Sequence, residues 1–299
     1  MQKRRASALR PSWTSRLPPR CEARAAPSWE DATAPGRALR APSPPPCASL
    51  GLLRYPHWGS GGASSLEQLL NLGGFPEPFL SGSERSARRW SLEYRTRLVR
   101  EEITSLEQIV DLGSLELLAI RLPELVGSPL SINALREDLG VSHDSVTRWI
   151  AALERLYGLV RISPFGAPKI RAIKKAQKHY LFDWTQVREM PQRFENLVAM
   201  ALLKWVHHQH DAEGRDLELR YFRDIDGREV DFVVTESRKP IRFVEVKWSD
   251  GPADKSLRYL KQRFPEVDAW QISATGTKDV LTEHGIRIAP AARLLEGLV

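Results

Sequence analysis

Apolar positions follow a helical period in the first part of the globular sequence. Trp90, Tyr94 and Leu98 are spaced four residues apart, which predicts a long helix through them. Ser65 is a suitable N-cap for a shorter helix before it, because a serine hydroxyl accepts from a free amide of the first turn. We therefore expect a helical subdomain over residues 61–120.

Two short helices joined by a tight turn are predicted next, in the segment SPLSINALREDLGVSHDSVTRWI. Ser131 and Ser142 each stand where an N-cap is needed. Val146, Ile150 and Leu153 recur at helical spacing and form the inner stripe of the second helix. This pattern is typical of a helix-turn-helix.

A short β wing is expected after the second helix, formed by the runs Leu159–Ile162 and Lys169–Ile173. In a winged helix the second helix is the recognition helix, and Thr147 and Arg148 would then face a DNA backbone. Asp144, in the first turn of that helix, repels phosphate. The alternative is a winged helix that only packs or contacts a protein.

Two segments in the C-terminal part of the chain alternate in the way typical of β-strands, and acidic residues occupy some of their positions. In GREVDFVV the alternation places Glu229 and Asp231 on one face and Val230 on the other. In RFVEVKWS it places Glu245 and Lys247 together. Since a tight turn and a short loop connect neighbouring strands here, we expect these four polar side chains to converge.

An amphipathic helix precedes these strands, in the segment PQRFENLVAMALLKWVHH. Phe194, Leu197 and Leu202 lie in its apolar arc, and Asn196 is predicted on the opposite, solvent-facing side. Glu195 falls inside the arc. An ionised carboxylate there is desolvated unless a cation or hydrogen-bond donors meet it.

Converging carboxylates repel one another by roughly 4 kcal/mol per close pair at an intermediate dielectric constant, and a divalent cation reverses the sign. Oxygen ligands without cysteine or clustered histidine favour Mg²⁺ or Mn²⁺. A lysine beside them can orient water or stabilise a pentavalent phosphate, so the pattern predicts phosphodiester hydrolysis. The alternative is a solvated sheet face on which Glu245, Lys247 and Arg228 form salt bridges.

Asp231, followed on the next strand by Glu245-Val246-Lys247, resembles the motif of the PD-(D/E)XK nuclease superfamily. The resemblance implies that Asp231 and Glu245 bind the metal, that Lys247 assists the nucleophile and that Glu195 is an accessory ligand. Glu229 and Asp231 stand in place of a Pro-Asp pair, so one identifying residue of the motif is missing and Glu229 is treated as accessory.

The remaining elements of this region complete a predicted α/β domain. Strands are expected over Leu217 to Arg223, Ala269 to Ser273 and, as an edge strand, Ile286 to Ile288. A helix is expected over Asp254 to Arg263. Basic side chains on it, Lys255 and Arg258 among them, could touch a phosphate backbone, although an ordinary solvated helix explains them equally well.

From about Leu66 onward, the order of GGFPEPFL, RLVREEI, the helix-turn-helix segment, KHYLFDW, RFENLVA and GREVDFVV is similar to bacterial and archaeal ATPases of the AAA class that end in a domain of unknown function. The resemblance implies a winged helix and a nuclease-like domain after an AAA module. No G-x-x-x-x-G-K-[ST] occurs in this sequence, and Gly59–Ser64 lacks the phosphate-binding lysine. We expect a truncated family member without a nucleotide site or ATP hydrolysis.

Net charge changes the picture only for the first sixty residues. They hold ten basic and three acidic side chains, which accounts for the whole net charge of +7, and ten of the 21 prolines. We expect residues 1–60 to be disordered and unrelated to the family, the alternative being an organellar transit peptide. The rest of the chain is balanced, so any DNA-binding face there must come from local clustering.

Both cysteines, Cys21 and Cys47, also lie in this segment, so no zinc or disulfide framework is expected and a cytoplasmic location is predicted. No apolar run is long enough for a membrane helix. The expected partners are DNA, a protein or a second copy of the chain. The expected fold is mixed α+β, with these domains: 1–60 disordered, 61–120 helical, 121–178 winged helix and 179–299 nuclease-like α/β.

Overall fold

The structure, a computed structural model, describes residues 58–103, 111–166 and 177–298. Residues 1–57 and the predicted wing strand Lys169–Ile173 lie outside the described residues.

Helices make up the first described part of the chain, as expected. Their bounds are α1 Trp58–Leu72, α2 Pro76–Leu80, α3 Glu84–Arg97, the π-helical turn η2 Leu98–Ile103, α5 Leu112–Arg121 and the 3₁₀ turn η3 Leu122–Leu125. Helix α1 begins at Trp58, so the prediction that Ser65 caps it is wrong, and the Gly/Ser run forms its first turns instead. Gly73, with φ of +86°, allows the chain to turn from α1 into α2.

Helices α6 (Ile132–Leu139) and α7 (His143–Arg155) form the predicted pair. The Ser131 hydroxyl accepts from the amide of Ala134, and the Ser142 hydroxyl accepts from that of Ser145, so both N-caps are confirmed. Gly140, with φ of +66°, ends α6 in the left-handed conformation. The predicted inner stripe of α7 is buried.

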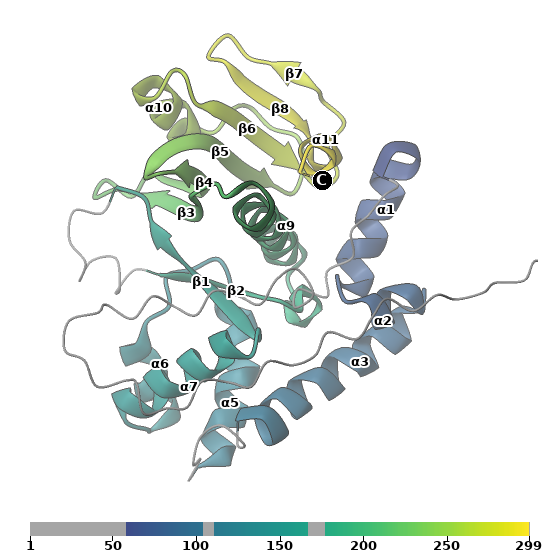
Figure 1. Cartoon of the computed structure of the whole chain (residues 1–299), viewed down its shortest axis with the longest axis vertical. Coiled ribbons are helices and arrows are strands. Elements are labelled where there is room, and N and C mark those ends of the chain that lie inside the picture. Colours follow the sequence, from purple (N-terminus) through teal and green to yellow (C-terminus); the bar gives the residue numbers. More distant parts are fainter. Residues whose placement is uncertain (1–57, 104–110, 167–176, 299) are drawn as a thin grey trace, which may run out of the picture. The chain divides into compact units, whose positions relative to one another are not determined.

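One mixed sheet of eight strands joins the rest of the described chain (Figure 1), in the order β2-β1-β3-β4-β5-β6-β8-β7. The strands are β1 Leu159–Pro164, β2 Lys178–Leu181, β3 Leu217–Arg223, β4 Glu229–Glu236, β5 Lys239–Lys247, β6 Asp268–Ser273, β7 Val280–Leu281 and β8 Ile286–Pro290. Strands β3, β4 and β5 are antiparallel, and β5, β6 and β8 are parallel. The fold is therefore mixed α+β, as expected.

Strands β1 and β2 pair with each other, and β1 also runs parallel to β3. The expected wing strand β1 is thus part of the main sheet, and the predicted domain boundary at 178/179 falls inside β2. The prediction that Ile286 to Ile288 is an edge strand is wrong, because β8 lies between β6 and β7. The short loop before β5 consists of Ser237 and Arg238, which both adopt positive φ and turn the chain in two residues, so that β5 begins at Lys239.

Helices cover the sheet on two sides (Figure 1). Helix α9 (Met190–Glu213) packs into the larger core together with Phe232 and Val234 of β4. Helix α10 (Lys255–Arg263) packs into a smaller core with Val230 and Val233. Strict alternation would put Val230 and Phe232 on one face, and this is wrong, because the two side chains lie in different cores. The last helix, α11 (Ala291–Glu296), contacts α1.

Among the described residues, no helix combines the length and the apolar character that a membrane crossing requires.

Candidate active site

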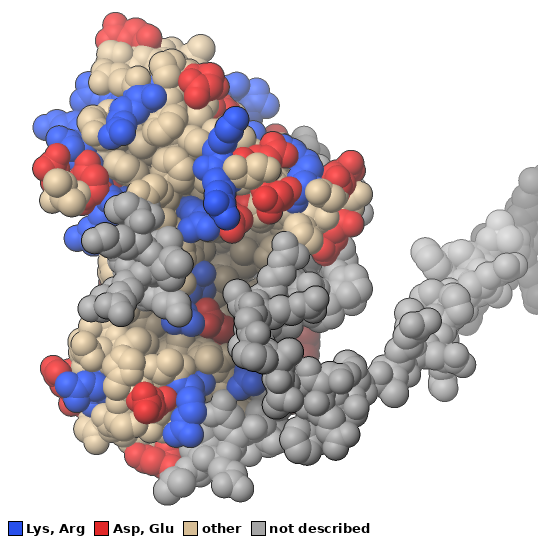
Figure 2. Space-filling model, turned by 60° about the vertical axis from the view of Figure 1, so that its left-hand side comes forward, with Lys and Arg blue, Asp and Glu red and all other residues tan. Residues whose placement is uncertain are grey.

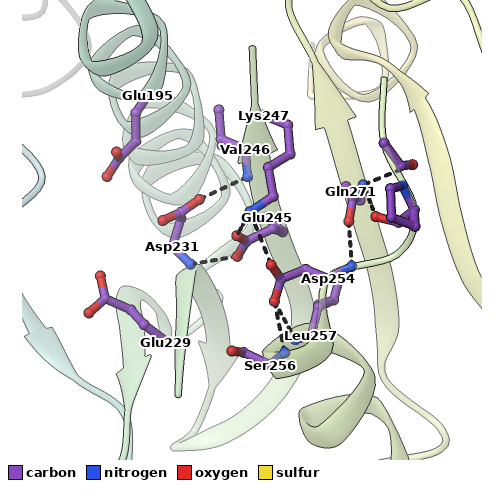
Figure 3. A network of polar contacts seen from close by, with 12 residues as sticks. Glu195, Glu229, Asp231, Glu245, Val246, Lys247, Asp254, Ser256, Leu257 and Gln271 are labelled. Carbon is purple, nitrogen blue, oxygen red and sulfur yellow. Dashed lines mark hydrogen bonds and ion pairs between the residues drawn. The ribbon is translucent and has the colours of Figure 1, made fainter. Parts of the chain in front are cut away.

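Acids from two neighbouring strands meet where β4 and β5 lie side by side (Figure 3). The backbone amide of Asp231 donates to Oε2 of Glu245 over 3.4 Å, and the amide of Val246 donates to Oδ2 of Asp231 over 2.8 Å. The pairing of Phe232 with Val244 sets this register, because it puts the preceding residue of β4 next to the following residue of β5. The structure thus brings together the two carboxylates that the sequence placed on separate strands.

The side chain of Lys247, at the end of β5, reaches Glu245 and Asp254 (Figure 3). Its Nζ is 2.7 Å from Oε1 of Glu245 and 3.1 Å from Oδ2 of Asp254. Burial alone lowers the pKa of Lys247, but Glu245 and Asp254 together raise it above its ordinary value. Lys247 is therefore an ammonium and a hydrogen-bond donor, and not a base.

Asp254 is a residue that the sequence analysis did not select. Its Oδ1 accepts from the amides of Ser256 and Leu257 and so caps α10, while its own amide donates to Oε1 of Gln271 over 2.7 Å. Although burial raises the pKa of Asp254, hydrogen bonds from Lys247 and from these amides lower it overall. The strand lysine, the following loop and helix α10 are fixed to one another through this carboxylate.

Lys178, on β2, is the other residue that the sequence analysis missed. Its Nζ lies 2.5 Å from Oε1 of Glu229, 3.9 Å from Oε1 of Glu195 and 4.0 Å from Oδ1 of Asp231. Only 1% of its side chain is exposed. Burial lowers the pKa of Lys178, but the three carboxylates outweigh it and raise the pKa overall. Both accessory acids are therefore placed at the same cluster, around a buried ammonium.

Helix α9 places Glu195 in this cluster, facing away from solvent as its position in the apolar arc predicted. The hydroxyl of Tyr180 donates to Oε1 of Glu195 over 2.8 Å. Asn196 was predicted to face solvent, and this is wrong: it is fully buried, and its amide group binds both the N–H and the C=O of Leu181 on β2. Strand β2 occupies the side of α9 that the sequence pattern assigned to water.

The acids of the cluster hold their protons more tightly than isolated carboxylic acids. Burial raises the pKa of Glu195 to about 7 and the pKa of Glu245 well above its ordinary value, and in both cases the negative charge of Asp231 is the second-largest cause. Burial also raises the pKa of Asp231, against the effect of Lys178. The cluster is therefore held together by ammonium groups and by protons.

The raised pKa of Glu195 makes stability depend on pH. Between about pH 4.5 and pH 7 the folded protein retains a proton that the unfolded chain has released, so the free energy of unfolding falls as the pH rises through this window. Glu195→Gln removes this contribution. In EDTA, we expect the variant to be more stable than the wild type at pH 8 and to lose this advantage at pH 5, as measured by urea unfolding. An advantage that is equal at both pH values would contradict the assignment.

Gly127 packs directly against the Glu195 carboxylate. A Cβ at this position would lie 2.9 Å from both carboxylate oxygens, and Gly127 has φ of +77°. Gly140 has φ of +66° and open space around it, which makes Gly140→Ala a matched control for backbone strain alone. We expect Gly127→Ala to cost about 1–3 kcal/mol more than Gly140→Ala in urea unfolding, because Glu195 must move. Equal losses of unfolding free energy in the two variants would show that the Glu195 side chain can move aside without cost.

The donor set is compatible with a hard divalent cation, since it consists of carboxylate oxygens in a desolvated place. Within the described part of the chain, no three His, Cys, Asp or Glu side chains are grouped closely enough to hold a metal ion in this conformation. Lys178 stands among Glu195, Glu229 and Asp231 instead. Metal binding there requires that the ammonium and the carboxylates rearrange.

The predicted DNA-contacting residues fall into two groups. Thr147 and Arg148 are exposed on α7. Lys255 and Arg258 line a hollow of about 870 Å³ whose wall also includes Lys247 and Trp248. On the face shown in Figure 2, basic side chains are interspersed with acidic ones, as the balanced charge of this part of the chain predicts. Of the two groups, only the pair on α10, Lys255 and Arg258, lines the same hollow as Lys247.

Comparison with known proteins gives two family matches. Residues 63–190 match the model of a domain of unknown function (DUF8612), and residues 192–294 match that of another (DUF4143). The two matches meet at the start of α9, later than the predicted boundary at 178/179. No curated protein and no solved structure matches the chain. The region that holds α9 and strands β3 to β8 thus matches DUF4143, the C-terminal domain often found with AAA ATPases.

Proposed function

We propose that the cluster around Asp231 and Glu245 is the centre of a Mg²⁺- or Mn²⁺-dependent phosphodiesterase that acts on DNA. The observation that carries the proposal is the convergence of Asp231, Glu245 and Lys247 on adjacent strands, with Glu195 supplied by the preceding helix. This arrangement agrees with the one that the PD-(D/E)XK resemblance implies. In the same proposal, α6, α7 and β1 belong to a winged helix.

Asp231, Glu245 and Glu195 would hold the cation. When bound, it would supply Lewis-acid polarisation of a phosphoryl oxygen and lower the pKa of a water molecule. Lys247, an ammonium with a free approach from the hollow, would donate to a phosphate oxygen and stabilise its developing charge.

DNA association in this proposal is supported by Lys255 and Arg258, which lie beside Lys247 in the hollow. Lys255 is exposed and could reach phosphate oxygens, whereas Arg258 is half-buried and its Nε is enclosed without a hydrogen-bond partner among the described residues. Thr147 and Arg148 would add a second contact through α7. The match to DUF4143 supports a working context next to an AAA ATPase, which would act as a separate module or partner.

A second candidate is a non-catalytic module that binds DNA or a protein. It is favoured by one specific observation: the ammonium of Lys178 lies within 4.0 Å of Glu229, Glu195 and Asp231, so the chain's own residues already compensate part of the cluster's negative charge. In this function the acids and lysines tie β2, β4 and α9 together.

Relaxation of supercoiled plasmid by the purified protein distinguishes the two. The phosphodiesterase predicts relaxation in Mg²⁺ or Mn²⁺, none in EDTA, and its loss in Glu245→Gln but not in Glu266→Gln, which changes an exposed glutamate of the same domain. Absence, in the wild type, of both metal-dependent plasmid relaxation and metal-dependent cleavage of single-stranded DNA would leave the non-catalytic module.

A further inference from the structure

Lys178 occupies a place that no motif of this chain assigns. It is the first residue of the short strand β2 and is fully enclosed, with three carboxylates around its Nζ and the ring of Tyr221 centred 5.2 Å away. Burying an ammonium costs free energy unless charges and hydrogen bonds compensate it. The acids therefore stabilise the charged form of Lys178, and Lys178 stabilises the charged forms of the acids.

The carboxylates around Lys178 overlap with those that would hold a divalent cation. Glu195 and Asp231 each approach its Nζ at about 4 Å, and these same two side chains belong to the proposed ligand set. Lys247 is different, because it contacts Glu245 and Asp254 and neither Glu195 nor Glu229. Lys178 therefore competes for Glu195 and Asp231, whereas Lys247 pairs with one proposed ligand only, Glu245.

We infer that Lys178 is a positioning residue: an internal cation that takes the place of a divalent ion between Glu195 and Asp231 and thereby sets the affinity of the site for metal. The inference rests on the proposed function only in taking these acids as metal ligands. A divalent ion brought to them meets a positive charge in a desolvated place, so binding requires the ammonium, which is already paired with Glu229, to move away from Glu195 and Asp231. Without metal, the ammonium compensates the negative charge of the carboxylates and so stabilises the folded site. It also disfavours the binding of any cation whose attraction to the carboxylates is too weak to displace it.

Removing the charge at Lys178 tests this directly. We expect Lys178→Met to bind Mn²⁺ at least about tenfold more tightly than the wild type in calorimetric titration, because the competing charge is gone. Lys239→Met, which changes an exposed lysine of β5, should bind Mn²⁺ as the wild type does. In EDTA, Lys178→Met should unfold at a lower temperature, and Mn²⁺ should raise its Tm more than that of the wild type.

Lys178→Gln keeps a donor for Glu229 without a charge, and it serves if Lys178→Met does not fold without metal. Adding Asp231→Asn to either variant should abolish the gain, which locates the bound ion. An affinity of Lys178→Met or Lys178→Gln equal to or below that of the wild type would overturn the inference, as would absence of Mn²⁺ binding in all of them. Plasmid relaxation is scored separately: tighter Mn²⁺ binding without cleavage would support the role of Lys178 and contradict the phosphodiesterase.

Discussion

Asp231→Asn is expected to reduce metal-dependent plasmid relaxation by roughly 10³-fold, which corresponds to about 4 kcal/mol of transition-state stabilisation. Asparagine has the same shape as aspartate and can still accept from the amide of Val246, so the junction of β4 and β5 should be preserved. What is lost is the negative charge that would hold a cation next to Glu245. The measurement is the initial rate of plasmid relaxation in Mg²⁺ and in Mn²⁺.

Asp216→Asn is the matched control, since this exposed aspartate lies just before β3. It should relax plasmid at the wild-type rate. Because burial raises the pKa of Asp231, the asparagine variant should also be at least as stable as the wild type in EDTA. A variant that is stable but as active as the wild type would remove Asp231 from the ligand set and, with it, the PD-(D/E)XK assignment.

The part of the site on β4 and β5 could be predicted because it is encoded locally. Period-two alternation and a short connection between two strands suffice to bring Asp231 near Glu245 and Lys247, and the structure places them in contact. Glu195 could be predicted for a related reason: a charge inside an apolar arc indicates a partner within the fold. Both signals depend only on residues close together in the sequence.

Lys178 could not be predicted, because its role depends on pairing between distant segments. The run KHYL shows no unusual charge pattern. The lysine reaches the acids only because β2 pairs with β1 and packs against α9. Asn196 was misplaced for the same reason, since β2 covers the side of α9 that looked solvent-facing. The edge position predicted for Ile286 to Ile288 failed because β7 is only two residues long, too short to produce a pattern.

A buried carboxylate, that of Asp183, is one of the groups that connect the end of β2 to the N-terminal helices. It follows β2 and is 1% exposed. It accepts from the hydroxyl of Ser91 on α3, from the amide and the hydroxyl of Thr185 over 3.1 Å and 2.6 Å, and from the side-chain amide of Gln186 over 3.2 Å. One side chain thus joins α3 to the segment that carries Lys178.

Asp183→Ala should lower the free energy of unfolding by about 4 kcal/mol, since it leaves the buried hydroxyl of Ser91 and the partly buried donors of Thr185 without an acceptor and opens a small cavity. For a chain of this size the Tm should fall by roughly 10 °C. Asp211→Ala, at an exposed position, should change stability by less than about 0.5 kcal/mol. Asp183→Asn, which retains an acceptor oxygen, should lie between the two in urea unfolding.

Asp183→Asn also tests whether Asp183 fixes the position of Lys178 or only stabilises the fold. If Asp183 fixes the end of β2, loosening it should also loosen Lys178, and the Asp183→Asn protein, still folded at 25 °C, should bind Mn²⁺ more tightly than the wild type. Hydrogen exchange at the amides of β2 would then rise more than at those of β5. If Asp183→Asn loses stability while exchange in β2 is unchanged, Asp183 stabilises α3 alone, and the position of Lys178 is set by Asn196 and the strand pairing of β2.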